Sequence, residues 1–425
     1  MPEQAVLPAA TQERIASLGA VDIVVGIPSY NNADTIAHVV RAAQSGLHVH
    51  FAGYRGLIVN SDGGSIDGTP EKVLDLPGEP EELLQLPYRV DPVERLSTPY
   101  HGVPGRASAI RTIFEIARAT QAKACVLFDS DLQGVVPDWV KALVAPVIED
   151  RADFVAAWHT RRKFDGTITS GILYPLTRAL YGKRIRQPFG GELAVSPAYV
   201  ERALTQSVWN SDLSRDGFDV WLTDFALVGG FRLAQARLGP REQQAREPGS
   251  DLAATLVQVL APVFLEIERH VATWQKIRGS EAVPAFGSAP ALSAETAEVD
   301  TAKMIEAFRF GQQNLQDVWG LVLTPATMVE MKKIARAAEM RMPDDVWART
   351  VYDFALGYRL RVIARDHLLR AMTPLYLGWV ASFVQETRQL GPEATEARIE
   401  KLCLAFEQLK PYLISRWRWP DRFNP

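Results

Sequence analysis

The chain has 425 residues, of which 47% are hydrophobic and 23% charged, and it carries a formal net charge of -4 with a pI near 6.0. This balance is typical of a globular protein and excludes a largely disordered one. The length predicts two domains. A mildly acidic chain does not indicate a cationic surface for nucleic acid, so we expect no nucleic-acid partner.

The sequence predicts neither a leader nor a membrane span. Residues 1–20 lack a basic start followed by an apolar block. The nearest approach to a span, residues 372–384, is shorter than the roughly 20 residues required and contains Pro374. Cys125 and Cys403 lie far apart in apolar contexts, which argues against a disulfide framework or a zinc site and predicts two buried packing thiols. We therefore expect a cytoplasmic protein with no membrane partner.

Short apolar runs alternate with helical patterns between residues 21 and 250. Predicted strands cover residues 22–28, 56–60, 84–90, 124–128 and 152–158. Predicted helices cover residues 32–44, 105–120 and 140–148. Continuous apolar runs suit strands covered on both faces, and the alternation with helices is typical of crossover connections. The pattern predicts an α/β domain with a mostly parallel sheet.

From about residue 251 the apolar residues recur at helical spacing, as in Leu256, Val259, Leu260, Val263 and Phe264. Residues 279–293, rich in Ala, Pro, Ser and Gly, predict a loop or linker. Further helices are predicted over residues 302–315, 325–340, 344–369, 375–389 and 393–409. We therefore expect an N-terminal extension over residues 1–20, an α/β domain over 21–250 and a helical domain over 251–425. The apolar faces of the helical domain fit a homodimer interface or the domain's own core equally well.

Two carboxylates follow the apolar run at residues 124–128. Asp129 and Asp131 are one residue apart at the expected carboxyl edge of the sheet, where open α/β folds bind ligands. Carboxylate oxygens and a diphosphate together hold a divalent cation, which can neutralise charge on a departing nucleoside diphosphate. A solvated turn with two acidic caps is the alternative, but the preceding strand and a second polar motif upstream favour a metal site for Mg²⁺ or Mn²⁺.

That second motif, SDGGSIDGT at residues 61–69, follows the predicted strand GLIVN. Its glycines let the backbone turn sharply and approach a ligand. Asp62 is placed to accept hydrogen bonds from a base or ribose. For Asp67 and Thr69 the favoured interpretation is capping of the next helix.

A third polar motif, GIPSYNN at residues 26–32, ends the first predicted strand and is expected beside the second motif across the sheet. Its polar side chains could bind a nucleoside. A helix cap formed by Asn32 or Asp34 accounts for the motif equally well.

The order IPSYNN, NSDGGSIDGT and LFDSD resembles that of glycosyltransferases with the GT-A fold. RQPFGGE at residues 186–192 resembles the QP-x-GGE segment of mannosylglycerate and glucosylglycerate synthases. The tail, with VYDFALGYR, RDHLL and PLYLGWVASF, also resembles bacterial members of that group. The similarity covers most of the chain, from about residue 21 to 417.

This resemblance implies a retaining transfer of glucose or mannose from a GDP-, UDP- or ADP-hexose to a small hydroxy acid such as D-glycerate. It implies donor contacts from Pro28, Tyr30, Asn31, Asp62, Arg106, Asp129 and Ser130, and acceptor contacts from Gly190, Gly191, Glu192 and Asp216. For Arg106, a solvated position on its helix is an equally good account. Catalytic roles fall to Asp131, Glu192 and Asp219, and metal ligation to Asp129, Asp131 and Gln243. The basic triplet at residues 161–163 is a candidate for an acceptor carboxylate, with a solvated face as the alternative.

One departure from the family pattern concerns the metal. Where these enzymes usually carry a histidine ligand, the segment LGPREQQ at residues 238–244 contains none, and Gln243 falls at that position. An amide oxygen can ligate Mg²⁺ or Mn²⁺ but is a weaker donor for softer metals. His159, at the end of a strand, is a poor substitute and is expected to be structural. Gln243 keeps open a catalytically silent nucleotide-sugar-binding protein. A nucleotidyltransferase is a third hypothesis, although GIPSYNN lacks the glycine-rich basic loop of those enzymes.

Overall fold

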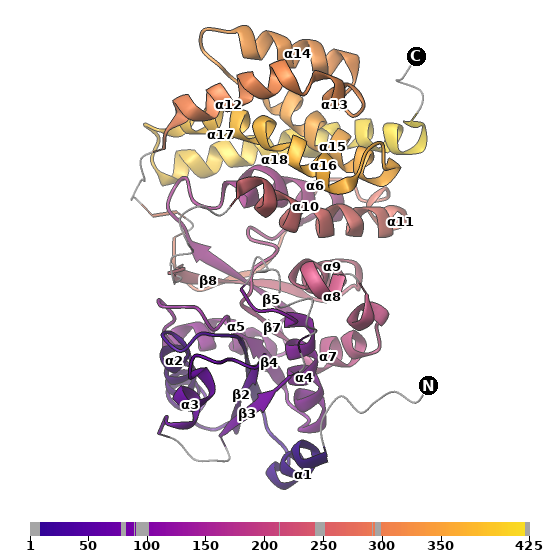
Figure 1. The fold of residues 1–425 in the computed structure, drawn as a ribbon. Helices are drawn as coiled ribbons and strands as arrows, with labels where there is room; N and C mark the ends of the chain where they lie inside the picture. Colours follow the sequence, from indigo (N-terminus) through magenta and orange to yellow (C-terminus); the bar gives the residue numbers. More distant parts are fainter. Residues whose placement is uncertain are drawn as a thin grey trace. The chain divides into compact units, whose positions relative to one another are not determined.

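The computed structural model describes residues 9–77, 82–88, 90, 102–211, 213–242, 251–290, 292–293 and 299–420. The chain divides into two compact units (Figure 1). Unit 1 comprises Met1–Thr160, Phe189–Arg246 and Val283–Pro290, and unit 2 comprises Arg161–Pro188, Glu247–Ala282 and Ala291–Pro425. Neither unit is continuous in sequence, and the domain boundaries after residues 20 and 250 stay a prediction.

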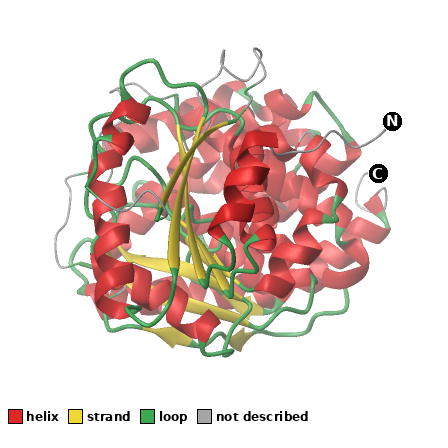
Figure 2. Ribbon diagram, turned by 90° about the horizontal axis from the view of Figure 1, so that it is seen from below, coloured by secondary structure: helices red, strands yellow, loops and turns green. Residues whose placement is uncertain are grey.

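Unit 1 is built on a mostly parallel sheet, as the sequence predicts. Its described strands are β1 (Ile23–Ser29), β2 (Gly56–Asp62), β3 (Leu83–Pro87), β4 (Ala124–Leu127), β5 (Phe154–Thr160), β7 (Leu193–Val195), β8 (Leu233–Pro240) and β10 (Ala285–Phe286). They lie in the order β10-β8-β5-β7-β4-β1-β2-β3, and Figure 2 draws the strands in yellow. Only β7 among them runs antiparallel to its neighbours, β4 and β5. The fold class is therefore confirmed as α/β.

Helices cover both faces of this sheet. The helices of unit 1 are α1 (Ala9–Leu18), α2 (Ile36–His50), α3 (Thr69–Leu74), α4 (Arg106–Ala119), α5 (Pro137–Ile148), α7 (Pro197–Leu204), α8 (Leu213–Asp216) and α9 (Phe218–Val228). Val39 of α2 and Leu143 of α5 share one apolar core with Val25 of β1. The next residue of β1, Gly26, faces the other way, since a Cβ there would lie 2.5 Å from Cγ2 of Ile113 in α4. Alternating side chains of a buried strand thus meet helices on opposite faces.

Unit 2 is mainly helical. Its helices are α6 (Tyr174–Tyr181), α10 (Leu252–Arg269), α11 (Val271–Trp274), α12 (Thr301–Asn314), α13 (Gln316–Gly320), α14 (Pro325–Arg336), α15 (Asp344–Leu360), α16 (Arg365–Ala371), α17 (Thr373–Thr387) and α18 (Pro392–Arg418). A short pair joins β6 (Lys183–Arg184) to β9 (Glu281–Ala282). Segment 161–188 is fastened within this unit, because the Trp347 indole donates to the Gly171 carbonyl at 2.8 Å and the Trp379 ring occupies the space a Gly171 side chain would need.

Two local predictions need correction. The single helix predicted over residues 344–369 is interrupted, because Arg361 adopts a left-handed backbone with φ of 54° and the next helix starts at Arg365. The stretch predicted as loop over residues 279–293 contains β9 and β10, and Ala285 of β10 pairs with Gln235 of β8. Cys125 and Cys403 are free and buried, as predicted. Across the described residues, no helix has both the length and the apolar character to cross a lipid bilayer.

Candidate active site

The three polar motifs meet at the carboxyl edge of the sheet. Strands β1 and β2 pair in parallel with Ser29 opposite Asp62, which sets the GIPSYNN and SDGGSIDGT motifs side by side as expected. The Asn31 side chain accepts a hydrogen bond from the Ile66 amide at 3.0 Å, and the Asn31 amide donates to Ser65 Oγ at 2.8 Å. These bonds join the loops after β1 and β2.

The Asp129–Asp131 segment is attached to the GIPSYNN motif through Ser130. Its hydroxyl donates to Asn32 Oδ1 at 2.7 Å, and its carbonyl accepts from Thr35 Oγ1 at 2.7 Å. The Asn32 amide in turn donates to Thr69 Oγ1 at 2.8 Å. Residues distant in the sequence thus form one hydrogen-bonded edge, which is where ligands bind in open α/β sheets.

Asp62 holds its own loop in place. Its Oδ1 accepts from the amides of Gly64 and Ser65 at 2.9 and 2.8 Å, and its Oδ2 accepts from the hydroxyls of Ser29 and Ser65 at 3.0 and 2.6 Å. Only 2% of Asp62 is exposed. A contact from Asp62 to a base or ribose stays a prediction.

The predicted donor residues of the GIPSYNN motif differ in exposure. Pro28 is buried in β1, opposite Ser61 of β2. Tyr30 is half-buried and packs against the small cluster that contains Tyr88. Asn31 is exposed, with a left-handed backbone at φ 52°, a conformation that asparagine tolerates better than most residues.

The most distinctive feature of the edge is a buried ionic cluster around Asp129. Arg106 Nη2 lies 2.6 Å from Asp129 Oδ1, and Arg241 Nη2 lies 2.5 Å from Asp129 Oδ2. Arg106 Nε also donates to Asp219 Oδ1 at 3.0 Å. Asp129 is 3% exposed, so its charge is balanced by guanidinium groups rather than by water.

Glu192 extends the same cluster. Arg241 Nη2 donates to Glu192 Oε1 at 2.9 Å, and His159 Nε2 lies 2.9 Å from Glu192 Oε2. Glu192 and His159 are each 1% exposed. Arg241 thus bridges Asp129 and Glu192, two carboxylates that would otherwise repel each other in a buried place.

The antiparallel strand β7 explains how Glu192 reaches this edge. Parallel strands β4 and β5 end at the edge, and β7 runs between them in the opposite direction, with Leu193 opposite Leu127 of β4. A strand that runs against its neighbours begins where they end. Glu192, directly before β7, therefore lies at the level of Asp129, directly after β4 and Phe128.

The close packing of the GGE segment on Asp129 requires a glycine. A Cβ built on Gly191 would lie 2.2 Å from Asp129 Oδ2, whereas one on Gly190 would meet no atom within 4 Å. The Gly191 carbonyl accepts from Arg106 Nη2 at 3.3 Å. Gly191 therefore lets main chain approach the carboxylate and its arginine partner directly.

Burial and the neighbouring cations shift the pKa values of Asp129 and Glu192 in opposite directions. Burial raises the pKa of Asp129 to about 7, although the charges of Arg106 and Arg241 act to lower it. Burial would also raise the pKa of Glu192, but Arg241 and His159 outweigh burial and hold that pKa well below its usual range. Glu192 is consequently ionised at neutral pH and accepts hydrogen bonds.

The structure brings together much of the predicted site and adds to it. Arg106, Asp129, Gly191, Glu192 and Asp219 form or border the ionic cluster. The side chain of Asp216, in α8, and the whole of Gln243 lie outside the described residues. Arg241 is not among the site residues predicted from the sequence, although it lies in the LGPREQQ segment, where the family resemblance implies a metal ligand. His159, which the sequence predicts to be structural, is buried against Glu192.

The basic triplet at residues 161–163 belongs to unit 2. Lys163 donates to three carbonyls at the end of α17, those of Thr387, Arg388 and Leu390, at 3.0, 3.1 and 2.6 Å. Its ammonium has three N–H donors, and these bonds use all of them. Lys163 therefore caps a helix.

The oxygen atoms at this edge of the sheet decide whether a divalent cation fits. Among the described residues, no group of three or more His, Cys, Asp or Glu side chains could hold a metal. Each carboxylate oxygen of Asp129 is paired with a guanidinium group. Asp131 is half-buried, and its charge helps to raise the pKa of Arg241. Carboxylate oxygens suit Mg²⁺ or Mn²⁺. A cation that used both aspartates, with substrate phosphates completing its shell, would compete with Arg241 for Asp129.

Comparison with known proteins gives structural similarity only. No family model and no curated protein matches the sequence. The chain is similar to glucosyl-3-phosphoglycerate synthase from Mycobacterium tuberculosis solved with Mn²⁺, UDP and phosphoglyceric acid, at 20% identity and a TM-score of 0.42, over 63% of this chain and 84% of that one. A structure described as a mycobacterial protein matches at 24% identity and a TM-score of 0.41, over 62% of this chain and 79% of that one. Likeness this distant does not decide the family, so function is argued from the side chains of the site.

Removing Arg241 should destabilise the protein by about 3 kcal/mol, because Asp129 and Glu192 would be left buried without their shared counter-charge. In a double-mutant cycle measured by urea unfolding, Arg241→Met combined with Glu192→Gln should cost less than the sum of the single changes. Arg232→Met is the matched control, because Arg232 is half exposed and pairs with Asp150 and Asp153 at the surface, where such pairs contribute about 1 kcal/mol or less. Strict additivity of Arg241 and Glu192 would contradict the bridge.

Gly191→Ala should lower the melting temperature, because its Cβ would displace the Asp129 carboxylate from Arg241. Overpacking of this kind costs about 1–3 kcal/mol. Gly190→Ala, one residue earlier, adds the same methyl group to open space and should leave the melting temperature nearly unchanged. Equal effects of the two changes would mean that the close approach to Asp129 is not a constraint.

Proposed function

We propose that this protein is a retaining glycosyltransferase of the GT-A type that moves a hexose from a nucleotide-sugar donor to a small hydroxy acid such as D-glycerate. The observation that carries the proposal is the convergence of three polar motifs and a charged cluster at the carboxyl edge of a mostly parallel sheet. The resemblance of the motifs to mannosylglycerate and glucosylglycerate synthases supports the same function.

The two arginines of the cluster suit the leaving group. As the glycosidic bond breaks, negative charge builds up on the departing nucleoside diphosphate, and fixed cations in a dry site stabilise such charge strongly. Arg106 begins α4, so the positive end of that helix dipole adds to its charge. Both guanidiniums are already oriented by Asp129, which reduces the reorganisation required when a diphosphate binds.

Mg²⁺ or Mn²⁺, held by Asp129 and Asp131 with Gln243 as a further oxygen donor, would act as a Lewis acid on the departing diphosphate. The chain's other acids suit hydroxyl groups. Glu192 and Asp219 accept hydrogen bonds within the cluster, and each could accept one from a sugar or glycerate hydroxyl in a bound complex. The transition state of such transfers is oxocarbenium-like, and ionised carboxylates nearby favour it. Retention of configuration rests on the family resemblance.

We place this activity in the cytoplasm, because both cysteines are free and buried and neither is paired in a disulfide. A donor of GDP-, UDP- or ADP-glucose or GDP-mannose fits the proposal equally. D-glycerate and 3-phosphoglycerate are both acceptor candidates, the latter being the type of ligand bound in the similar mycobacterial synthase.

The proposal is tested by release of nucleoside diphosphate from each of these donors, with each acceptor, in Mg²⁺, Mn²⁺ or EDTA. Acceptor-stimulated release that EDTA suppresses is the expected outcome and identifies both substrates. Donor binding in calorimetry with no release under any condition would instead establish a silent nucleotide-sugar-binding protein. Release of pyrophosphate from a nucleoside triphosphate would overturn the proposal in favour of a nucleotidyltransferase.

Asp131→Ala should lower turnover at least 100-fold while changing the free energy of unfolding by less than about 1 kcal/mol, because a half-buried ligand side chain supports little core packing. It should also remove any thermal stabilisation by Mn²⁺ plus nucleoside diphosphate. Asp317→Ala, which removes an exposed carboxylate from α13, should change neither turnover nor the effect of Mn²⁺. An active Asp131→Ala protein with normal metal dependence would exclude Asp131 from the metal site.

A further inference from the structure

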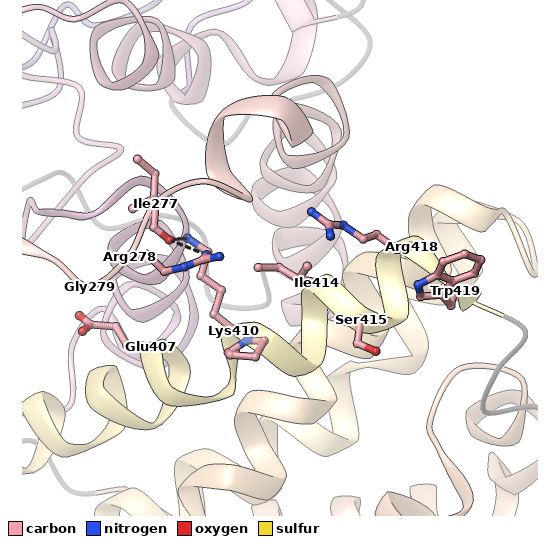
Figure 3. Close-up of a pocket in the computed structure, with 10 residues that line it drawn as sticks. Ile277, Arg278, Gly279, Glu407, Lys410, Ile414, Ser415, Arg418 and Trp419 are labelled. Atoms are coloured by element: carbon pink, nitrogen blue, oxygen red, sulfur yellow. Dashed lines mark hydrogen bonds between the residues drawn. The ribbon is translucent and has the colours of Figure 1, made fainter.

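A cavity lined by charged side chains lies within unit 2. It has a volume of about 430 Å³ and lies between residues 277–279, which follow α11, and the C-terminal half of α18 (Figure 3). Lys410 and Arg278 are near each other at one end of the view, and Arg418 and Trp419 project farther along α18. None of these residues belongs to the ionic cluster around Asp129.

Lys410 is the buried cation of this cavity. It is 5% exposed, and its ammonium donates to the carbonyls of Leu180 and Ile277 at 3.1 and 3.0 Å. An ammonium group has three N–H donors, and these two bonds use two of them. Burial and the neighbouring Arg278 lower the pKa of Lys410 to about 8, with Glu407 acting in the opposite direction.

The other two cations of the cavity are also held by neutral oxygens. Arg278 Nη1 donates to the carbonyls of Gln275 and Ile277 at 3.0 and 3.3 Å. Arg418 donates from Nε and Nη2 to the amide oxygen of Gln275 at 3.0 and 2.8 Å. Hydrogen bonds to amide oxygens orient these guanidiniums without neutralising their charge.

The nearby carboxylates are engaged elsewhere. Glu407 lines the cavity, but its Oε1 accepts from Arg178 Nε at 2.5 Å and from Ser280 Oγ at 2.6 Å. Arg178 also forms an ion pair with Glu400 at 2.5 Å. Arg184 adds another positive charge nearby, because its Nε donates to Ser280 Oγ at 3.0 Å. The neighbourhood therefore carries an excess of positive charge in a partly buried place, which favours an anion.

The loop that supplies Arg278 is fixed in position. It lies over the end of α6, where a Cβ on Gly182 would come within 2.7 Å of Ile277 Cγ2 and 3.1 Å of the Gly279 carbonyl. The amide of Glu281 donates to the Gly182 carbonyl at 3.0 Å. The backbone that carries Arg278 is thus part of the packed structure of unit 2.

We propose that this cavity is a binding site for a phosphate group, carried by a small phosphorylated compound or present as free inorganic phosphate. Two guanidiniums and an ammonium that line one cavity supply charged hydrogen-bond donors of the kind that bind phosphate oxygens. Ile414 lines the same cavity and Trp419 is 63% exposed beside it, so an apolar surface is available to the organic part of an ester. The site does not depend on the function proposed for unit 1.

The test measures binding of inorganic phosphate and of glycerol 3-phosphate to the full chain by calorimetry, at constant ionic strength set with chloride and without nucleotide. Saturable binding to the wild-type chain is expected. Arg278→Gln together with Arg418→Gln should weaken it at least 10-fold, and both residues are exposed, so the variant should fold normally. Lys401→Gln, at an exposed position on the same helix, is the matched control and should bind like the wild type.

Tighter binding of the ester than of inorganic phosphate would identify a phosphorylated metabolite as the ligand class, and equal binding would identify phosphate itself. Two outcomes would overturn the proposal. One is the absence of binding by the wild-type chain at millimolar phosphate. The other is binding that the Arg278→Gln, Arg418→Gln variant retains in full, because phosphate would then occupy another site, such as the arginines of unit 1.

Discussion

The ion pairs of Asp129 with Arg106 and Arg241 organise unit 1, because a buried carboxylate is tolerated only when it is paired. To supply those partners, the start of α4 and the end of β8 must both reach the end of β4. Glu192 pairs with the same guanidinium group of Arg241, so the start of β7 must also lie beside the end of β4. One carboxylate therefore fixes the relative positions of segments that are more than a hundred residues apart.

The same ion pairs determine how the carboxyl edge of the sheet would respond to ligand binding. In the free protein the arginines are neutralised by Asp129, Asp219 and Glu192. A diphosphate would bind Arg106 and Arg241 and so free the aspartates for a divalent cation. A divalent cation would bind the aspartates and so free the two arginines for a diphosphate. Binding of the two would then be mutually favourable, and that coupling is reciprocal by thermodynamic necessity. An ion-paired resting state is thus compatible with a metal-assisted reaction.

The strand and helix alternation was readable from the sequence because buried parallel strands leave long apolar runs, such as residues 22–28 and 124–128. The placement of Asp129 and of the two asparagines of the GIPSYNN motif at the carboxyl edge of the sheet followed from it. The positions of Arg241 and His159 beside Glu192 were not readable, since they depend on β7, an antiparallel strand of only three residues. The break at Arg361 has no glycine or proline to mark it, and β10, two residues long, lies in a stretch whose composition is typical of loops.

Because segments of the two units alternate along the chain, they limit where the protein can be truncated and how it can fold during synthesis. A fragment that stops near residue 250 would lose β10, leaving the outer side of β8 unpaired and open to association with other chains. It would also keep segment 161–188 without Trp347, Trp379 and the acidic residues of α18 that hold it in unit 2. During synthesis, the sheet remains unfinished until the ribosome has passed residue 286, which lengthens the period in which apolar surface needs protection.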